Sequence, residues 1–162
     1  MTALVLAVPV GGKPEKITMG PCEVSFDLGD VGAYSISNTE QSEKDTLQGI
    51  PYMDYQVTIK GASPTKLVML GISKYESPMN FNMEKLVTDA IRTRSFACGE
   101  PSTMPRTIDG KSGAVGNAAC PCFDFYAAAY PLDTNSQVVI SSTYPWEEGT
   151  SNLIRTIHVE KK

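Results

Sequence analysis

The segment that most constrains the fold is Thr107–Asp133, where a turn signal is followed by two cysteines and an aromatic run. Asp109-Gly110 between extended residues is a strong signal for a two-residue hairpin turn. Cys122–Tyr130 is apolar and aromatic, as is typical of a buried strand. Alternation places on one side of this strand Phe123, Phe125 and Ala127, and on the other Cys122, Asp124, Tyr126, Ala128 and Tyr130. The segment therefore predicts sheet structure, and only its two cysteines remain candidates for chemistry.

Several other segments have the pattern of β-strands. These are Cys22–Leu28, Ala33–Asn38, Tyr52–Lys60, Lys66–Tyr75 and Val138–Thr143. The third and fourth flank Gly61–Thr65, which contains Gly and Pro, so we expect a hairpin. Thr39–Gly49 is polar and lacks periodicity, which predicts an exposed loop. Ser95–Arg106 contains two prolines and is expected to be irregular.

Two helices are expected. The stronger is Asn82–Arg94, which Asn80 or Asn82 can cap and whose final arginines suit the helix dipole. Trp146–Arg155 is expected to form a short helix near the C-terminus, before extended residues at Ile157–Val159. Strands and helices occur in blocks rather than in alternation. The sequence therefore predicts an α+β fold, with a mainly antiparallel sheet and helices packed on its faces.

The length of 162 residues fits one domain. We assign residues 17–162 to this domain and residues 1–16 to an N-terminal extension or a first strand. Ala3–Val10 is apolar but too short to cross a bilayer. It lacks a positively charged start, so it does not resemble a complete signal peptide, although a trimmed leader would leave such a remnant. The rest of the sequence contains no transmembrane segment.

The net charge of −4, with scattered lysines and arginines, makes nucleic acid an unsuitable partner. We expect an exported or extracytoplasmic protein, with membrane association through a missing leader as one form of that location. A cytoplasmic protein is the alternative.

The element order resembles the PsbP-like family, which includes the extrinsic photosystem II proteins and the Ran-binding Mog proteins. The stretches that carry the resemblance are Tyr52–Lys60, Lys66–Tyr75, Asn82–Arg94, Ile108–Lys111, Phe123–Asp133, Val138–Thr143 and Asn152–Ile157. They cover about the last two-thirds of the chain and are mostly structural. The resemblance implies the PsbP-like α+β fold and a non-catalytic binding or assembly role, and it transfers no functional residue.

The four cysteines are Cys22, Cys98, Cys120 and Cys122. In Cys120-Pro121-Cys122 the two thiols face the same way on an extended backbone. Disulfide pairing is the favoured interpretation. Reduced structural cysteines and a Cys₄ or Cys₃His metal site are the alternatives. A redox C-x-x-C motif is absent, and we predict no cofactor.

Aromatic residues are the other candidates for binding. Tyr126, Tyr130, Tyr144 and Trp146 would line a groove if they converged, although packing against the sheet is the favoured interpretation. We expect Asp124 to face solvent beside Tyr126. The only histidine, His158, has no nucleophile motif near it, so we predict no catalytic residue.

These observations predict a non-catalytic binding or assembly module whose partner is a protein. A cysteine-based metal or redox protein and a small hydrolase with a dispersed site are the alternatives. The oligomeric state and the identity of the partner are not indicated by the sequence.

Overall fold

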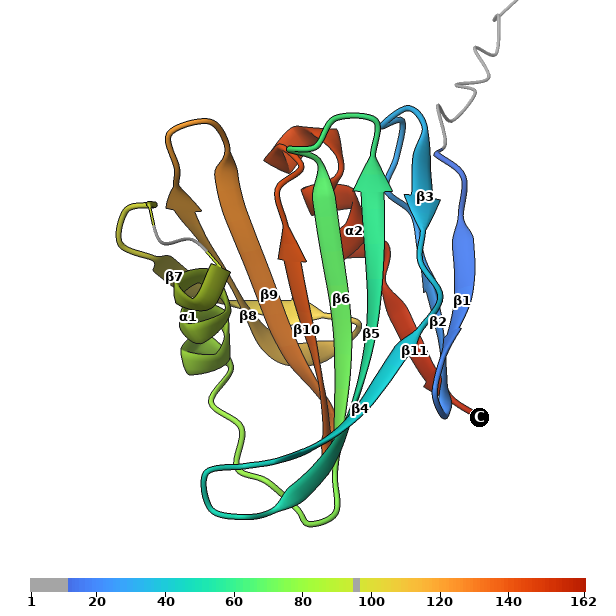
Figure 1. Cartoon of the computed structure of the whole chain (residues 1–162), viewed down its shortest axis with the longest axis vertical. Coiled ribbons are helices and arrows are strands. Elements are labelled where there is room, and N and C mark those ends of the chain that lie inside the picture. The colour runs from blue at the N-terminus through green and yellow to red at the C-terminus, as the bar shows by residue number, and fades with distance from the viewer. Residues whose placement is uncertain (1–11, 95–96) are drawn as a thin grey trace, which may run out of the picture.

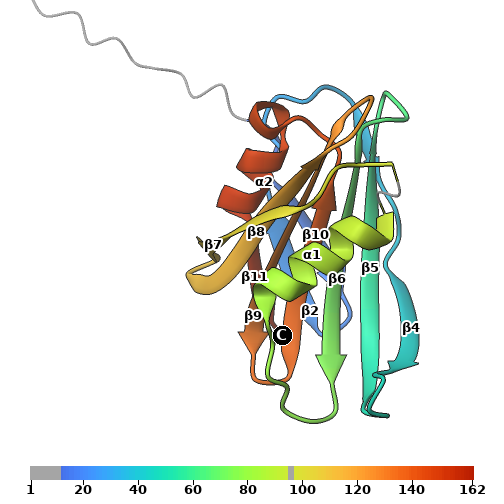
Figure 2. The same cartoon turned by 90° about the vertical axis from the view of Figure 1, so that its left-hand side faces the viewer.

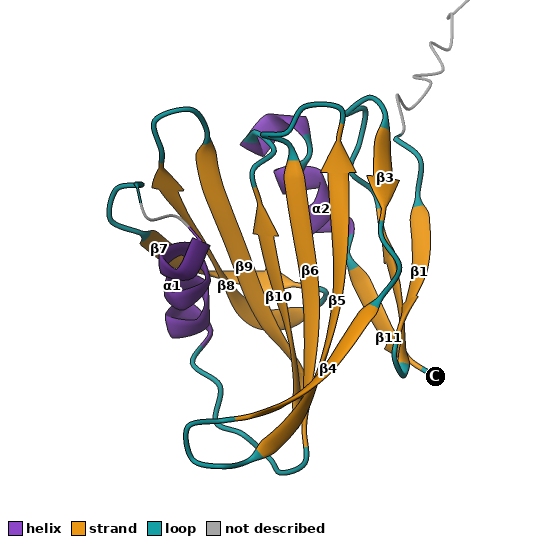
Figure 3. Ribbon diagram, viewed as in Figure 1, coloured by secondary structure: helices purple, strands orange, loops and turns teal. Residues whose placement is uncertain are grey.

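Antiparallel strands dominate the computed structural model, which describes residues 12–94 and 97–162 (Figures 1 and 3). Within these residues, eight strands form a large sheet of order β3-β5-β6-β10-β9-β8-β7, with β4 also paired to β5. Their bounds are β3 (Tyr34–Ile36), β4 (Glu40–Asp45), β5 (Pro51–Gly61), β6 (Leu67–Tyr75), β7 (Ser102–Ile108), β8 (Lys111–Ala119), β9 (Asp124–Asp133) and β10 (Ser136–Ser142).

The described residues also form a three-stranded sheet from the two ends of the chain, at the right in Figure 1. Its order is β1-β2-β11, with β1 (Glu15–Met19), β2 (Cys22–Phe26) and β11 (His158–Lys161). Alternate residues of β2 are buried, as their period-2 pattern predicts. Val24 pairs with Val159 across β2 and β11, so the end of the chain closes this sheet.

The main core lies between the two sheets. Val24 and Phe26 of β2 belong to one buried cluster with Leu70, Ile72 and Ile140 of the large sheet. The short helix α2 (Thr150–Thr156) follows the 3₁₀ turn η1 (Trp146–Glu148) and adds Leu153 and Ile154 to this cluster. This core fixes one face of the large sheet.

A second buried cluster lies on the other face of the large sheet, under helix α1 (Met83–Arg94). Figure 2 shows α1 in front of the sheet, and α2 belongs to the opposite face. The Asn82 side chain caps α1 by accepting a hydrogen bond of 3.0 Å from the Lys85 N–H. Val87 and Ile91 are buried against the alanines of β8 and β9. Small residues are required there, since a Cβ on Gly116 would lie 2.7 Å from Val87 Cγ1.

Several predictions from the sequence are confirmed. β5 and β6 pair as the expected hairpin, and α1 begins one residue after its expected start. Asp109 and Gly110 join β7 to β8 with φ of 51° and 69°, which is the backbone of a type I′ turn. The neighbouring residues Phe125 and Tyr126 of β9 face opposite sides, as predicted.

The predicted α+β class, with helices packed on the sheet faces, is wrong. Strands account for 51% of the structure and helices for 15%. The helix α1 covers only the part of the sheet formed by β7–β10, and α2 has 7 residues. Two segments expected to lack regular structure form strands β4 and β7, which accounts for part of the difference.

The expected loop at Thr39–Gly49 contains β4, all of whose residues are exposed. A strand with no buried face has no alternation to detect, so the prediction failed there. The segment expected to be irregular contains strand β7, which includes Pro105. β7 is the last strand of its sheet, and an edge strand tolerates a proline, which has no N–H to donate. The predicted apolar segment Ala3–Val10 lies outside the described residues.

Candidate functional site

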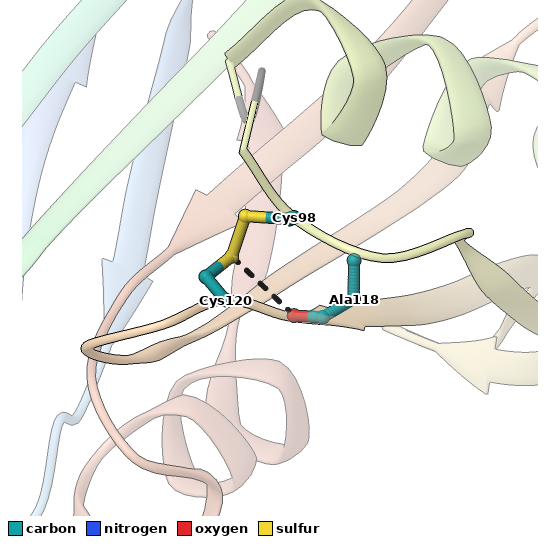
Figure 4. The surroundings of a disulfide bond; sticks show 3 residues. All are labelled: Cys98, Ala118 and Cys120. Atoms are coloured by element: carbon teal, nitrogen blue, oxygen red, sulfur yellow. Dashed lines mark hydrogen bonds between the residues drawn. A yellow bond between two sulfur atoms is a disulfide. The ribbon is translucent and has the colours of Figure 1, made fainter.

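A disulfide joins Cys98, after α1, to Cys120, before β9 (Figure 4). The Gly99 N–H donates a 2.8 Å hydrogen bond to the Ala119 carbonyl beside it. The dashed line in Figure 4 joins Cys120 Sγ to the Ala118 carbonyl oxygen at 3.7 Å, a contact only, because a disulfide sulfur carries no proton. The disulfide interpretation is thus confirmed for this pair.

The other two cysteines are free and lie in different surroundings. Cys22 is buried in the main core, and burial raises the pKa of its thiol. Cys122 is exposed. In the described parts of the chain, no three His, Cys, Asp or Glu side chains converge where a metal ion would bind. The interpretation as a reduced structural cysteine therefore fits Cys22, and Cys122 remains an accessible thiol.

The four candidate aromatic residues separate into two pairs. Tyr130 and Tyr144 are fully buried in the main core, so they cannot line a groove on the surface. Burial raises the pKa of both phenols, and Asp109 adds to the effect on Tyr130. Tyr126 and Trp146 lie together, with ring centroids 5.5 Å apart. The structure thus leaves only Tyr126 and Trp146 as binding candidates.

Tyr126 and Trp146 line a shallow hollow of about 210 Å³, which we call the Trp146 hollow. β9 supplies Tyr126, η1 supplies Trp146, and β7 supplies Met104 and Arg106. The guanidinium carbon of Arg106 lies 5.4 Å from the centroid of the Trp146 ring, a cation–π distance. Met104 is 58% exposed, which is unusual for a large apolar side chain. The hollow therefore combines aromatic, apolar and cationic groups at the edge of the sheet.

The acidic and the basic group beside the Trp146 hollow differ in whether they have a partner. Asp124 is hydrogen-bonded, whereas Arg106 has no ion pair among the described residues. The Tyr126 hydroxyl donates a 3.3 Å hydrogen bond to Asp124, which is exposed as expected. Burial, followed by the Asp124 carboxylate, raises the pKa of Tyr126, so this phenol stays protonated at neutral pH. Among the described residues Arg106 forms no ion pair, so its charge is available to a ligand.

A second hollow, of about 390 Å³, lies on the opposite face of the large sheet, beside the C-terminal end of α1. We call it the Arg94 hollow. Leu67 and Met69 of β6 form one apolar wall, and Phe123 and Phe125 at the start of β9 form the other. The Cys120 N–H donates a 3.1 Å hydrogen bond to the Phe123 carbonyl, and Cys120 is held by the disulfide. The disulfide therefore anchors the loop that presents Phe123.

His158 lies in a hydrogen-bond network that joins β11 to the turn between β7 and β8. Its Nδ1 lies 2.7 Å from Asp109 Oδ1, and its side chain is 61% exposed. The same carboxylate accepts a 3.0 Å hydrogen bond from the Val159 N–H. Asp109 thus ties the β7–β8 turn to β11. The His158 imidazole therefore lies at the surface rather than in a deep pocket.

Four residues that shape the two hollows cannot be identified from the sequence. Met104 and Arg106 share one side of β7, but their segment was expected to be irregular. From the sequence, Arg94 is expected only to suit the dipole of its helix, and Met69 only to belong to an apolar strand. The i, i+2 spacing of Met104 and Arg106 was the one available signal, and the intervening Pro105 obscured it.

No helix in the described residues is long and apolar enough to cross a membrane. A disulfide is typical of proteins outside the reducing cytosol, so the structure is compatible with an extracytoplasmic location. No family model, characterised protein or solved structure matches the chain. The resemblance to the PsbP-like family therefore stays a prediction from the sequence.

Proposed function

We infer that the protein is a non-catalytic binding module that holds a protein partner at the Trp146 hollow. The observation that carries this inference is the convergence of Trp146, Tyr126, Arg106 and Met104 on one exposed surface. Tyr, Trp, Met and Arg are the residues enriched in protein–protein interfaces, and Trp, Tyr and Arg dominate their binding energy. The inferred partner is extracytoplasmic, in keeping with the Cys98–Cys120 disulfide.

We expect the partner to be bound by side chains rather than by pairing with the exposed edge of strand β7. β7 ends the large sheet, and an unpaired strand edge can accept a further strand. Pro105 lies in the middle of β7 and has no N–H to donate, which makes this edge a poor template. A partner would therefore be recognised by the aromatic and cationic groups, and we expect it to present an apolar side chain beside a carboxylate.

The test is capture from an extract of the source cells with the wild-type protein and two variants. M104A/R106A removes two exposed groups of the hollow and is expected to keep the fold. L47A removes a fully exposed apolar side chain between β4 and β5 and serves as the control. We expect a specific protein bound by wild type and L47A, with affinity for M104A/R106A reduced at least about tenfold.

Two results would contradict the inference. One is a bound partner whose affinity is the same for M104A/R106A as for wild type. The other is turnover of a small substrate, which would identify an enzyme. Purified partner titrated against each variant by calorimetry gives the affinities, and thermal melting confirms that the variants are folded.

A further inference from the structure

The Arg94 hollow has the size and lining of a small-molecule site. Its volume of about 390 Å³ falls within the range of about 300–1,000 Å³ that is common for ligand pockets. Such pockets are mostly apolar and carry a few polar groups that orient the ligand. Here Leu67, Met69, Phe123 and Phe125 are the apolar groups, and Arg94 lies at the margin.

One polar group inside this hollow lacks a partner. Ser141 of β10 lines the hollow and is only 6% exposed. Its neighbour Ile140 belongs to the main core, so alternation directs the Ser141 side chain to the face that carries α1. Within residues 12–94 and 97–162 the Ser141 hydroxyl forms no hydrogen bond, whereas the Thr143 hydroxyl beside it bonds to the Thr65 carbonyl. This hydroxyl lines the hollow and is free to form a hydrogen bond with a ligand or with water there.

The charge of the hollow is positive, and the acidic group that acts on it is already paired with another residue. Arg94 makes no ion pair with any residue that the structure describes, and no Asp or Glu lines the hollow. Asp54 is the acidic group that acts on Arg94, and it is already bonded to Lys44 Nζ at 2.8 Å. Burial lowers the pKa of the Arg94 guanidinium, although an arginine remains charged at neutral pH. A ligand with a carboxylate would complement this site.

We propose that the Arg94 hollow binds a small organic carboxylate with an apolar body. The carboxylate bonds to the Arg94 guanidinium, whose forked donors match its geometry. The apolar body lies between Phe123 and Met69, and the Ser141 hydroxyl provides a further hydrogen bond within the hollow. This site is separate from the Trp146 hollow, because Phe125 and Tyr126 face opposite sides of the sheet.

Calorimetry with three matched probes tests the ligand class. Octanoate has both the apolar body and the carboxylate, octanol has only the body, and acetate has in effect only the carboxylate. We expect octanoate to bind with a Kd below about 1 mM and at least about tenfold more tightly than either control. Equal binding of octanoate and octanol, or octanoate binding weaker than this Kd, would overturn the proposal.

Variants of two neighbouring arginines test the position of the site. R94Q keeps the side-chain length but removes the charge, and we expect it to weaken octanoate binding at least about tenfold. R92Q is the matched control, because Arg92 is on the same helix but faces Glu100 at 3.2 Å. F123A should weaken binding several-fold through the lost apolar contact. An unchanged affinity in R94Q, or an equal loss in R92Q, would place the ligand elsewhere.

The protein-binding inference and the carboxylate-binding inference can be tested separately. The variants M104A/R106A should bind octanoate as wild type does, since the Trp146 hollow is on the other face. Loss of octanoate binding in M104A/R106A would contradict the separation of the two sites. Loss of the protein partner alone would leave the carboxylate site intact.

Discussion

Asp109 links the two sheets of the molecule through a single side chain. It lies in the turn between β7 and β8 of the large sheet and accepts hydrogen bonds from His158 and Val159 of the small sheet. Its φ of 51° is in the left-handed region, where Asp and Asn are better tolerated than most residues. Its side chain is only 8% exposed, so solvent cannot replace these partners freely. The aspartate is therefore fixed by both its backbone and its hydrogen bonds.

The substitution D109G separates these two roles. Glycine adopts a positive φ without cost, so the backbone of the turn is favoured. The half-buried Val159 N–H loses its acceptor, and we expect the free energy of unfolding to fall by about 1–3 kcal/mol. Urea denaturation measures this change.

H158A provides the control for the D109G measurement. It removes only the exposed partner of the carboxylate, and such exposed pairs contribute about 0–1 kcal/mol. If D109G is as stable as wild type, the hydrogen bonds between the sheets contribute nothing measurable.

At the scale of elements, the Cys98–Cys120 disulfide joins the end of α1 to the start of β9 across a sequence separation of 22. It also holds the loop that presents Phe123 to the Arg94 hollow. A single cross-link thus supports both stability and the shape of the candidate site. Reduction of the disulfide should therefore lower both the stability of the protein and the affinity of the Arg94 hollow for its ligand.

We expect C98S/C120S to lower the free energy of unfolding by about 3 kcal/mol, because a closed loop of this length restricts the unfolded chain. Octanoate affinity should also fall. C122S is the matched control, since Cys122 is exposed and unpaired. Urea denaturation with and without reductant measures the effect, and equal midpoints for wild type under both conditions would contradict it.

The same bond allows a test of the cellular location. Alkylation of the protein as it is taken from its source cells should label Cys22 and Cys122 after unfolding, but not Cys98 and Cys120. Labelling of all four cysteines would indicate a reducing compartment and contradict the inferred export.

How well each element could be predicted depended on whether one face of it is buried. β2, β5 and β6 alternate because one side packs in the core, and all three were identified. β4 is exposed on both sides, so only its pairing with β5 makes it a strand. In β7 most residues are exposed and one is proline, which is typical of an edge strand and of a loop alike.

At the scale of the whole molecule, the division into two sheets had no local signal in the sequence. β2 and β11 are paired, yet they lie at opposite ends of the chain. The same long-range pairing brings Asp109 next to His158. The alternation of side chains along β9 places Tyr126 and Phe125 on opposite faces of the large sheet. Both hollows are assembled from residues of distant elements. The sequence could therefore suggest Tyr126 and Trp146 as candidates, but not that Arg106 lies beside them or that Arg94 lines a second hollow.

The core between the two sheets makes the stability of the whole molecule sensitive to alkaline pH. Tyr130 is fully buried there, and burial together with Asp109 raises its pKa above the ordinary phenol value of about 10. Above that pH the unfolded chain loses a proton that the folded chain keeps. The contribution of Tyr130 to the free energy of unfolding should therefore be unaffected below about pH 9. It should fall above about pH 10, by up to about 1.4 kcal/mol per pH unit.

Y130F tests this assignment, because it keeps the ring in the core and removes the titrating hydroxyl. We expect the stability of Y130F to decline less steeply than that of wild type between about pH 10 and pH 11. The remaining slope comes from other groups whose pKa burial raises, such as Tyr144 and Cys22. Urea denaturation at a series of pH values measures both slopes. Identical slopes would show that Tyr130 ionises equally well in the folded protein, which a phenol enclosed between two packed sheets should not do.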